Sequence, residues 1–275
     1  MPLWGYGTVA HVLNWALRKG RIVASTIHNQ RYVCANGLFW RNNEECFQCF
    51  HSQNPLWGAV YNCRENTMES LSYASAISSA WMRNVYNHPT HRLIALNQKT
   101  AERLRKLFPC APVVQIPNVV NQNTEESDSF SLPAWKGKKI AVVGRLSFEK
   151  GMQRLINAIR WGSEKDGLTS DPSVRFIFAG DGPMRSLIEE EAKVNERVLY
   201  LGKISEKEVR SLLQSSDGYF FSSIVEEQSP TVLRQAATLN IPLYSWDGRI
   251  KPQEVVAQWG SPLTARQWVD AFLKL

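Results

Sequence analysis

The sequence contains no long apolar run. Its apolar stretches are broken by Asn, His or Arg before they reach the ~18 consecutive residues that a membrane-spanning helix needs. The first residues, MPLWGYGTVAHVLNWALRKG, also lack the basic lead and unbroken apolar centre of a signal peptide, because His11 and Asn14 interrupt them. These two absences predict a soluble cytoplasmic protein, acting in solution or at the inner face of a membrane.

Acidic side chains are scarce in the first half of the chain. Residues 1–125 hold 12 Lys and Arg against 6 Asp and Glu, whereas residues 126–275 hold 20 against 19. A basic half suggests an anionic partner such as lipid head groups, phosphates or nucleic acid, although a solvated basic face would have the same composition. Net charge bears on association and not on fold.

The second half alternates short apolar strands with helices. With 275 residues, of which 44% are apolar, the chain is long enough for two ordinary domains. Five buried strands, each separated from the next by a helix, predict a parallel doubly wound sheet. The strands are expected at residues 139–144, 174–180, 197–202, 217–223 and 241–246.

The first half repeats this alternation less completely. Helices are expected at residues 8–20, 67–86 and 99–108, and strands at 21–27, 92–96 and 112–116. A cysteine-bearing loop at 28–66 shows little periodicity, and residues 123–137 are polar, as in an interdomain linker. We therefore predict an N-terminal domain over 1–122, a linker over 123–137 and a C-terminal domain over 138–275.

Two cations follow the first strand of the predicted C-terminal domain. Gly144 and Arg145 come directly after residues 139–143, and Lys150 follows within the same turn. Ligands of doubly wound sheets bind at the carboxyl ends of the strands. The glycine lets a ligand approach the backbone, and the two cations can hold one anion between them. A surface turn whose cations point into water is the alternative.

A predicted helix start lies at the same edge of the sheet. Ser229 is a good N-cap and Pro230 suits the first helical position, so the N–H groups of Thr231 and Val232 would face an anion. The carboxylate of Glu227, just before this helix, could accept hydrogen bonds from sugar hydroxyls. Alternatively, an acidic residue here only complements the helix dipole.

Four of the five cysteines fall within the loop at residues 28–66. Cys34, Cys46, Cys49 and Cys63 include a C-x2-C pair and could hold a structural zinc ion, which would explain how the loop is held. Free thiols in a reducing cytoplasm, or a disulfide in an exported protein, are the alternatives. This loop also has aromatic residues between cations, a pattern that is typical of nucleic-acid-binding surfaces. Core packing and contacts with the acceptor explain these residues with fewer assumptions. We therefore expect no nucleic-acid partner.

Several motifs resemble the retaining glycosyltransferases of family 4, which have the GT-B fold. GRLSFEKG is similar to the G-R-L-x-x-x-K-G signature of that family, AGDGP follows the next strand, and EEQSPTVLRQAA is similar to its E-x7-E element. PNVV and TIHN also resemble family motifs in the right order. The resemblance implies two Rossmann-like parallel-sheet domains facing a cleft, with the N-terminal domain incomplete.

The resemblance also implies the roles of individual residues. A nucleotide-diphospho-sugar donor would place its diphosphate on Arg145 and Lys150, its sugar on Glu227 and its ribose on Gln235, with His28 near the sugar. The two cations would stabilise the leaving nucleoside diphosphate electrostatically, with no cofactor required for the chemistry.

The implied function is transfer of a hexosyl group to a glycan or lipid-linked acceptor, with retention, in envelope polysaccharide synthesis. Gln235 stands where the family has Glu, which weakens a ribose contact. The chain also lacks the first strand-helix units of the family pattern and its closing helices. The alternative is therefore a truncated nucleotide-sugar-binding protein without turnover, or one half of a transferase whose partner chain supplies the missing N-terminal part.

Overall fold

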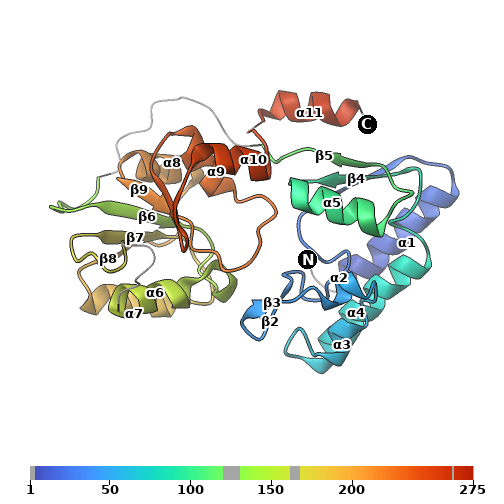
Figure 1. Cartoon of the computed structure of the whole chain (residues 1–275), viewed down its shortest axis with the longest axis horizontal. Helices are drawn as coiled ribbons and strands as arrows, with labels where there is room; N and C mark the ends of the chain where they lie inside the picture. Colours follow the sequence, from blue (N-terminus) through green and yellow to red (C-terminus); the bar gives the residue numbers. More distant parts are fainter. Residues whose placement is uncertain (1–3, 120–130, 162–167, 262, 275) are drawn as a thin grey trace. The chain divides into compact units, whose positions relative to one another are not determined.

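The computed structural model describes residues 4–119, 131–161, 168–261 and 263–274 (Figure 1). Most of the predicted linker, residues 123–130, lies outside the described residues. The chain divides into two compact units: the first contains residues 1–118, 225–229 and 258–275, and the second contains residues 119–224 and 230–257. The domain boundaries expected from the sequence stay a prediction.

The second unit is a six-stranded sheet with the order β11-β10-β9-β6-β7-β8. Its strands are β6 (Lys139–Val143), β7 (Arg175–Ala179), β8 (Val198–Tyr200), β9 (Gly218–Phe220), β10 (Leu243–Ser245) and β11 (Gly248–Ile250). The five strands β6 to β10 run parallel, as the sequence predicts, and β11 pairs antiparallel with β10.

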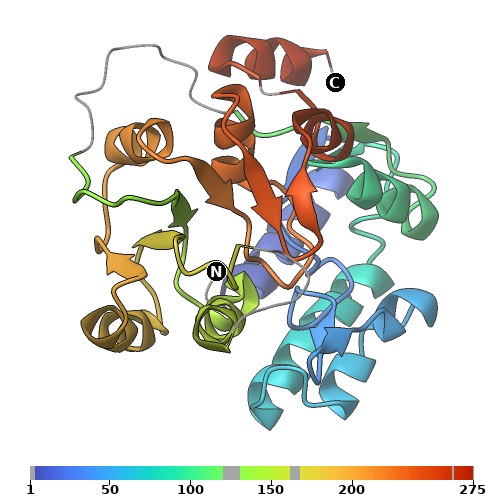
Figure 2. The same ribbon diagram turned by 60° about the vertical axis from the view of Figure 1, so that its left-hand side comes forward.

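Helices cover both faces of this sheet. They are α6 (Met152–Trp161), α7 (Arg185–Val194), α8 (Glu206–Gln214), α9 (Thr231–Thr238) and α10 (Pro252–Trp259). Figures 1 and 2 show α6 and α7 on one face and α8 and α9 on the other. Ile140, Val142, Phe176 and Phe178 of the central strands are at most 1% exposed. Double coverage explains why the strands read as apolar runs and not as alternating patterns.

The first unit has a smaller parallel sheet with the order β1-β4-β5. These strands are β1 (Val23–Ile27), β4 (His91–Ala95) and β5 (Val113–Gln115). The unit also contains α1 (Trp4–Arg18), α4 (Thr67–Met82), α5 (Gln98–Leu107) and α11 (Ala265–Leu273). Asn66 and Asn97 cap α4 and α5, since each side chain accepts a hydrogen bond from a backbone N–H three residues later. In the described ranges, no helix has both the length and the apolar character to cross a membrane.

The loop at residues 28–66 is structured. It contains β2 (Trp40–Arg41), β3 (Glu44–Glu45), α2 (Gln48–His51) and α3 (Trp57–Val60). Phe39 packs against both Phe47 and Phe50, and these three rings, together with Trp57, join the core around Leu93 and Leu104. Core packing therefore accounts for these aromatic residues.

Candidate functional site

The second unit has its topological switch point between β6 and β9. The chain passes from β6 to β7 on one side of the sheet and from β9 to β10 on the other, although β6 and β9 are neighbours. Ligands of doubly wound sheets bind in the crevice at such a point, outside the carboxyl ends of the strands. The segments that follow β6 and β9 carry most of the residues predicted from the sequence.

A cleft of about 430 Å³ opens at the carboxyl ends of β6, β7 and β8. Gly144, Arg145, Asp181 and Lys203 are among the residues that line it. Gly144 and Arg145 were predicted, whereas Asp181 and Lys203 were missed because the sequence does not show how far the loops after β7 and β8 extend. The exposed guanidinium of Arg145 and the ammonium of Lys203 give the cleft two cations.

Close backbone contact between two loops shapes this cleft. Leu146 N donates a hydrogen bond to Asp181 O at 3.0 Å, and Gly144 N donates to Ala179 O at 3.0 Å. A Cβ atom at position 180 would lie 1.8 Å from the Gly144 carbonyl oxygen, and φ at Gly180 is +144°. Only glycine allows this approach, which explains why AGDGP follows β7.

Lys150 ends a short 3-10 helix, η1 (Phe148–Lys150), which is bonded to the segment after β9. Ser222 Oγ donates to Lys150 O at 2.7 Å, and Ile224 N donates to Glu149 O at 3.1 Å. The next residue, Gly151, has φ +73°, and a Cβ there would lie 2.0 Å from Ser222 O. The backbone of Lys150 is thus fixed to the segment that leads to Glu226 and Glu227.

Helix α9 begins later than the sequence predicts. Its N-cap is Pro230, with an extended ψ of 94° and no capping side chain, so the expectation that Ser229 caps the helix was wrong. An extended proline cannot be the first helical residue, and it shifts the start to Thr231. The N–H groups of Thr231 and Val232 still belong to the first turn, which has no intrahelical acceptors for them.

Two polar side chains in α9 are buried. Gln235 is 5% exposed and Arg234 is fully buried, and desolvation lowers the pKa of Arg234 to about 10. Gln235 was predicted from the sequence, whereas the burial of Arg234 was not, because an arginine in a helix ordinarily indicates an exposed position.

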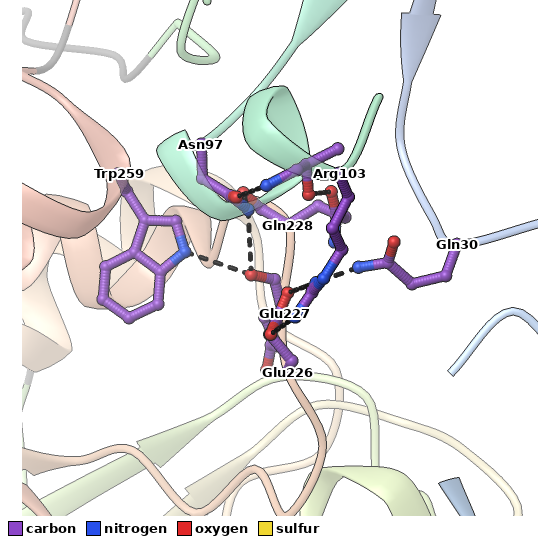
Figure 3. A network of polar contacts seen from close by, with 8 residues as sticks. Gln30, Asn97, Arg103, Glu226, Glu227, Gln228 and Trp259 are labelled. Carbon is purple, nitrogen blue, oxygen red and sulfur yellow. Dashed lines mark hydrogen bonds and ion pairs between the residues drawn. The ribbon is translucent and has the colours of Figure 1, made fainter. Parts of the chain in front are cut away.

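The acidic segment 225–229 belongs to the first unit. Figure 3 shows the polar contacts that it makes there. The guanidinium of Arg103, on α5, donates two hydrogen bonds to the carboxylate of Glu226, at 2.6 and 2.9 Å. The side chains of Arg103 and Glu226 are only 16% and 12% exposed. Burial works against the charge of Arg103, but Glu226 outweighs it, so the pKa of Arg103 is raised.

The next two residues are held by the same unit. Trp259 Nε1 donates to Glu227 O at 3.1 Å, and Asn97 Nδ2 donates to Gln228 O at 2.9 Å. Thr100 Oγ1 donates to Gln228 Oε1 at 2.5 Å. Asn97 therefore caps α5 with one side-chain atom and holds this segment with the other.

His28 follows β1 and is exposed. Two residues later, the buried Gln30 donates from Nε2 to Glu226 Oε1 at 3.3 Å. The two predicted catalytic residues, His28 and Glu227, thus lie in the same unit, on segments joined by the Gln30–Glu226 hydrogen bond. Arg145 and Lys150 lie in the second unit.

The zinc hypothesis for Cys34, Cys46, Cys49 and Cys63 is not supported. Among the residues that the structure describes, no group of three or more His, Cys, Asp or Glu side chains is arranged to hold a metal ion. Burial raises the pKa of Cys49 to about 12 and that of Cys63 to about 11, and neighbouring cysteines of the loop add to both shifts. The buried Cys34 points its thiol to Asn36 Oδ1, 3.0 Å away. Aromatic packing accounts for how the loop is held.

Residues 123–268, more than half of the chain, match the family model described as glycosyl transferases group 1. The chain belongs to this family. An uncharacterised glycosyltransferase of Methanocaldococcus jannaschii is 30% identical over 228 residues, which cover 82% of this chain and 53% of that protein. One subunit of the human phosphatidylinositol N-acetylglucosaminyltransferase is 28% identical over 68% of this chain and 38% of its own.

This member of the glycosyl transferases group 1 therefore spans little more than half of the archaeal relative and less than half of the human one. Among solved structures, Anabaena Alr3699/HepE, crystallised with UDP and glucose, has a TM-score of 0.56 at 14% identity, covering 98% of this chain and 66% of its own. Staphylococcus aureus TarM has a TM-score of 0.52 at 13% identity, with coverages of 94% and 45%. These likenesses show the fold, which is of the GT-B type with Rossmann-like parallel sheets.

Proposed function

We propose that the chain binds a nucleotide-diphospho-sugar donor and transfers its hexosyl group to a glycan or lipid-linked acceptor, with retention of configuration. The observation that carries this proposal is the arrangement of residues at the carboxyl ends of the strands, beside the switch point of the second unit. There, Gly144 and Arg145 line a cleft, and the Lys150 turn is bonded to the segment after β9. Family membership supports the reaction class.

The proposed chemistry follows from the charges at this edge. The bond between the sugar and the diphosphate breaks, and negative charge develops on the leaving phosphate oxygen. Arg145 and Lys150 stabilise that charge, because cations fixed beforehand need little rearrangement during the reaction. The N–H groups of Thr231 and Val232 and the dipole of α9 act on the same anion.

The remaining roles concern the sugar and the ribose. Glu227 accepts hydrogen bonds from sugar hydroxyls, His28 lies against the sugar, and Gln235 donates its amide to the ribose. An amide in place of a carboxylate makes the ribose contact weaker, since charge-assisted hydrogen bonds are roughly twice as strong as neutral ones. The name of the human relative, a subunit of a phosphatidylinositol N-acetylglucosaminyltransferase, includes a lipid, which supports a lipid-linked acceptor.

Isothermal calorimetry with UDP, GDP and ADP tests the donor site. The variant Arg145→Ala with Lys150→Ala is expected to bind the preferred nucleotide roughly 100-fold more weakly, because it loses two charge-assisted contacts worth about 1.5 kcal/mol or more each. The matched control, Lys193→Ala with Lys207→Ala, removes the same charge from exposed positions of the same unit.

Equal binding by the double variant and the wild-type protein contradicts the site. Binding by the wild-type protein without hydrolysis or transfer, in assays with a panel of nucleotide sugars and lipid acceptors, favours the alternative. That alternative is a nucleotide-sugar-binding protein, or one half of a transferase completed by a partner chain.

We also propose that the protein acts at the inner face of a membrane. No Asp or Glu occurs before Glu44, and Arg18, Lys19 and Arg21 lie close together in the sequence, at and just after the end of α1. Trp15 beside them is 61% exposed. Basic residues next to an exposed aromatic side chain favour an anionic lipid surface.

A further inference from the structure

We propose that Arg103 is a positioning residue: by holding Glu226, it fixes the carboxylate of Glu227 for the donor sugar. This inference rests on the proposed function, in which Glu227 contacts that sugar. Nothing in the sequence connects Arg103 with the acidic segment, which follows it by more than 120 residues.

The geometry of the ion pair restricts the segment. Two parallel hydrogen bonds join the planar guanidinium of Arg103 to both oxygens of Glu226, so the carboxylate can neither rotate nor slide without losing one of them. The rings of Phe39 and Phe47 lie 5.1 and 5.3 Å from the guanidinium carbon and fix its orientation in turn.

The residues on the other side of Glu227 are fixed as well. Trp259 donates to the carbonyl of Glu227 itself, and Asn97 and Thr100 hold Gln228 by its carbonyl and its side chain (Figure 3). Glu226 and Gln228 thus direct their side chains to the first unit, while Glu227 is anchored through its main chain. The network determines where the Glu227 side chain begins.

This arrangement suits a residue that must discriminate a sugar. A carboxylate gains most from hydroxyl hydrogen bonds when its position is set before binding, because no ordering entropy is then lost. Losing Arg103 would free the segment and weaken sugar contacts, while leaving the diphosphate contacts of Arg145 and Lys150 intact.

The test compares the affinity for a nucleoside diphosphate with the affinity for its sugar conjugate. Calorimetry with UDP, UDP-glucose and UDP-N-acetylglucosamine, or with the GDP or ADP counterparts if those bind, gives the gain in affinity due to the sugar. We expect Arg103→Met to reduce this gain roughly tenfold or more, the value of one charge-assisted hydrogen bond, and to leave nucleoside diphosphate affinity within twofold. Arg103→Lys should recover only part of the gain, since an ammonium cannot make the paired contact. Lys99→Met, an exposed cation on the same helix, is the control.

A second variant keeps the inference testable if Arg103→Met does not fold. Trp259→Phe removes one hydrogen bond to Glu227 O and keeps an aromatic ring, and it should reduce the gain by a smaller factor. Folded variants that keep the full gain in affinity from the sugar would overturn the inference. So would variants that lose as much affinity for the nucleoside diphosphate as for its sugar conjugate. A wild-type protein with no gain from the sugar would overturn it too. A wild-type protein that binds no nucleoside diphosphate removes the proposed function itself, which is a different result.

Discussion

Replacing Gly151 by alanine should break the junction that holds Lys150. Gly151 has φ +73°, a conformation that costs a residue with a Cβ about 1–2 kcal/mol. A Cβ there would lie 2.0 Å from Ser222 O, whereas real Cβ atoms keep at least 3.0 Å, so the carbonyl would have to retreat by about 1 Å.

That movement strains several hydrogen bonds at once. Trp246 Nε1 donates to Ser222 O at 2.8 Å, Ser222 Oγ donates to Lys150 O at 2.7 Å, and Ile224 N donates to Glu149 O at 3.1 Å. At about 1 kcal/mol each, loss of two or three of these bonds brings the total destabilisation to about 3–5 kcal/mol. The affinity for nucleoside diphosphates should fall as well, because Lys150 moves with the turn.

Gly202→Ala supplies a matched control for this prediction. Gly202 has the same φ of +73° and lies in the same unit, but a Cβ there would meet nothing within 4 Å. Thermal unfolding followed by circular dichroism should show a Tm loss of about 6–20 °C for Gly151→Ala and about 2–8 °C for Gly202→Ala, at roughly 2–4 °C per kcal/mol. If the two variants melt within 2 °C of each other, the contact between the new Cβ atom and Ser222 O does not destabilise the protein. The explanation given for Gly151 would then be wrong.

Thiol reactivity and membrane binding provide two further predictions. Maleimide at pH 8 should modify the exposed Cys110 first, since burial raises the pKa of Cys49 to about 12 and that of Cys63 to about 11. The latter two thiols should react faster as pH rises toward those values, and modification of Cys49 before Cys110 in the folded protein would contradict their burial. Vesicles containing phosphatidylglycerol should sediment the wild-type protein and release it as salt rises. Trp15→Ser should bind them more weakly, whereas Trp161→Ser, which replaces another exposed tryptophan, should bind normally, and equal binding by both would remove the proposed membrane surface.

The sequence predicted the second unit well because its central parallel strands β6, β7 and β9 are buried on both faces. Apolar runs such as those of β6 and β7 stand out from their neighbours, and Gly144 and Arg145 could be placed at the sheet edge from their position after a strand. Strand β11 was missed, because three residues containing Gly and Arg show no apolar pattern.

Long-range polar contacts could not be predicted in the same way. Asn97 is recognisable as a helix cap, but nothing in its neighbourhood indicates that its other atom holds Gln228. Likewise, Arg103 lies on the polar side of α5, where a solvated cation would be expected, and its burial depends on Glu226 far along the chain. The start of α9 was misplaced because proline at the helix start can serve either as the cap or as the first helical residue.

Residues 225–229 belong to the first unit, and this affects how functional hybrids between this protein and its relatives can be designed. A hybrid joined at the linker would combine residues 1–118 with a second half from a relative, and that half would bring its own counterpart of Glu226. Arg103 would keep its aromatic neighbours. It would pair with a carboxylate only if the relative has an acidic residue at the position of Glu226. Exchange of donor specificity between members of this family should therefore succeed most often when the counterparts of Arg103, Asn97 and Trp259 travel with the acidic segment that they hold.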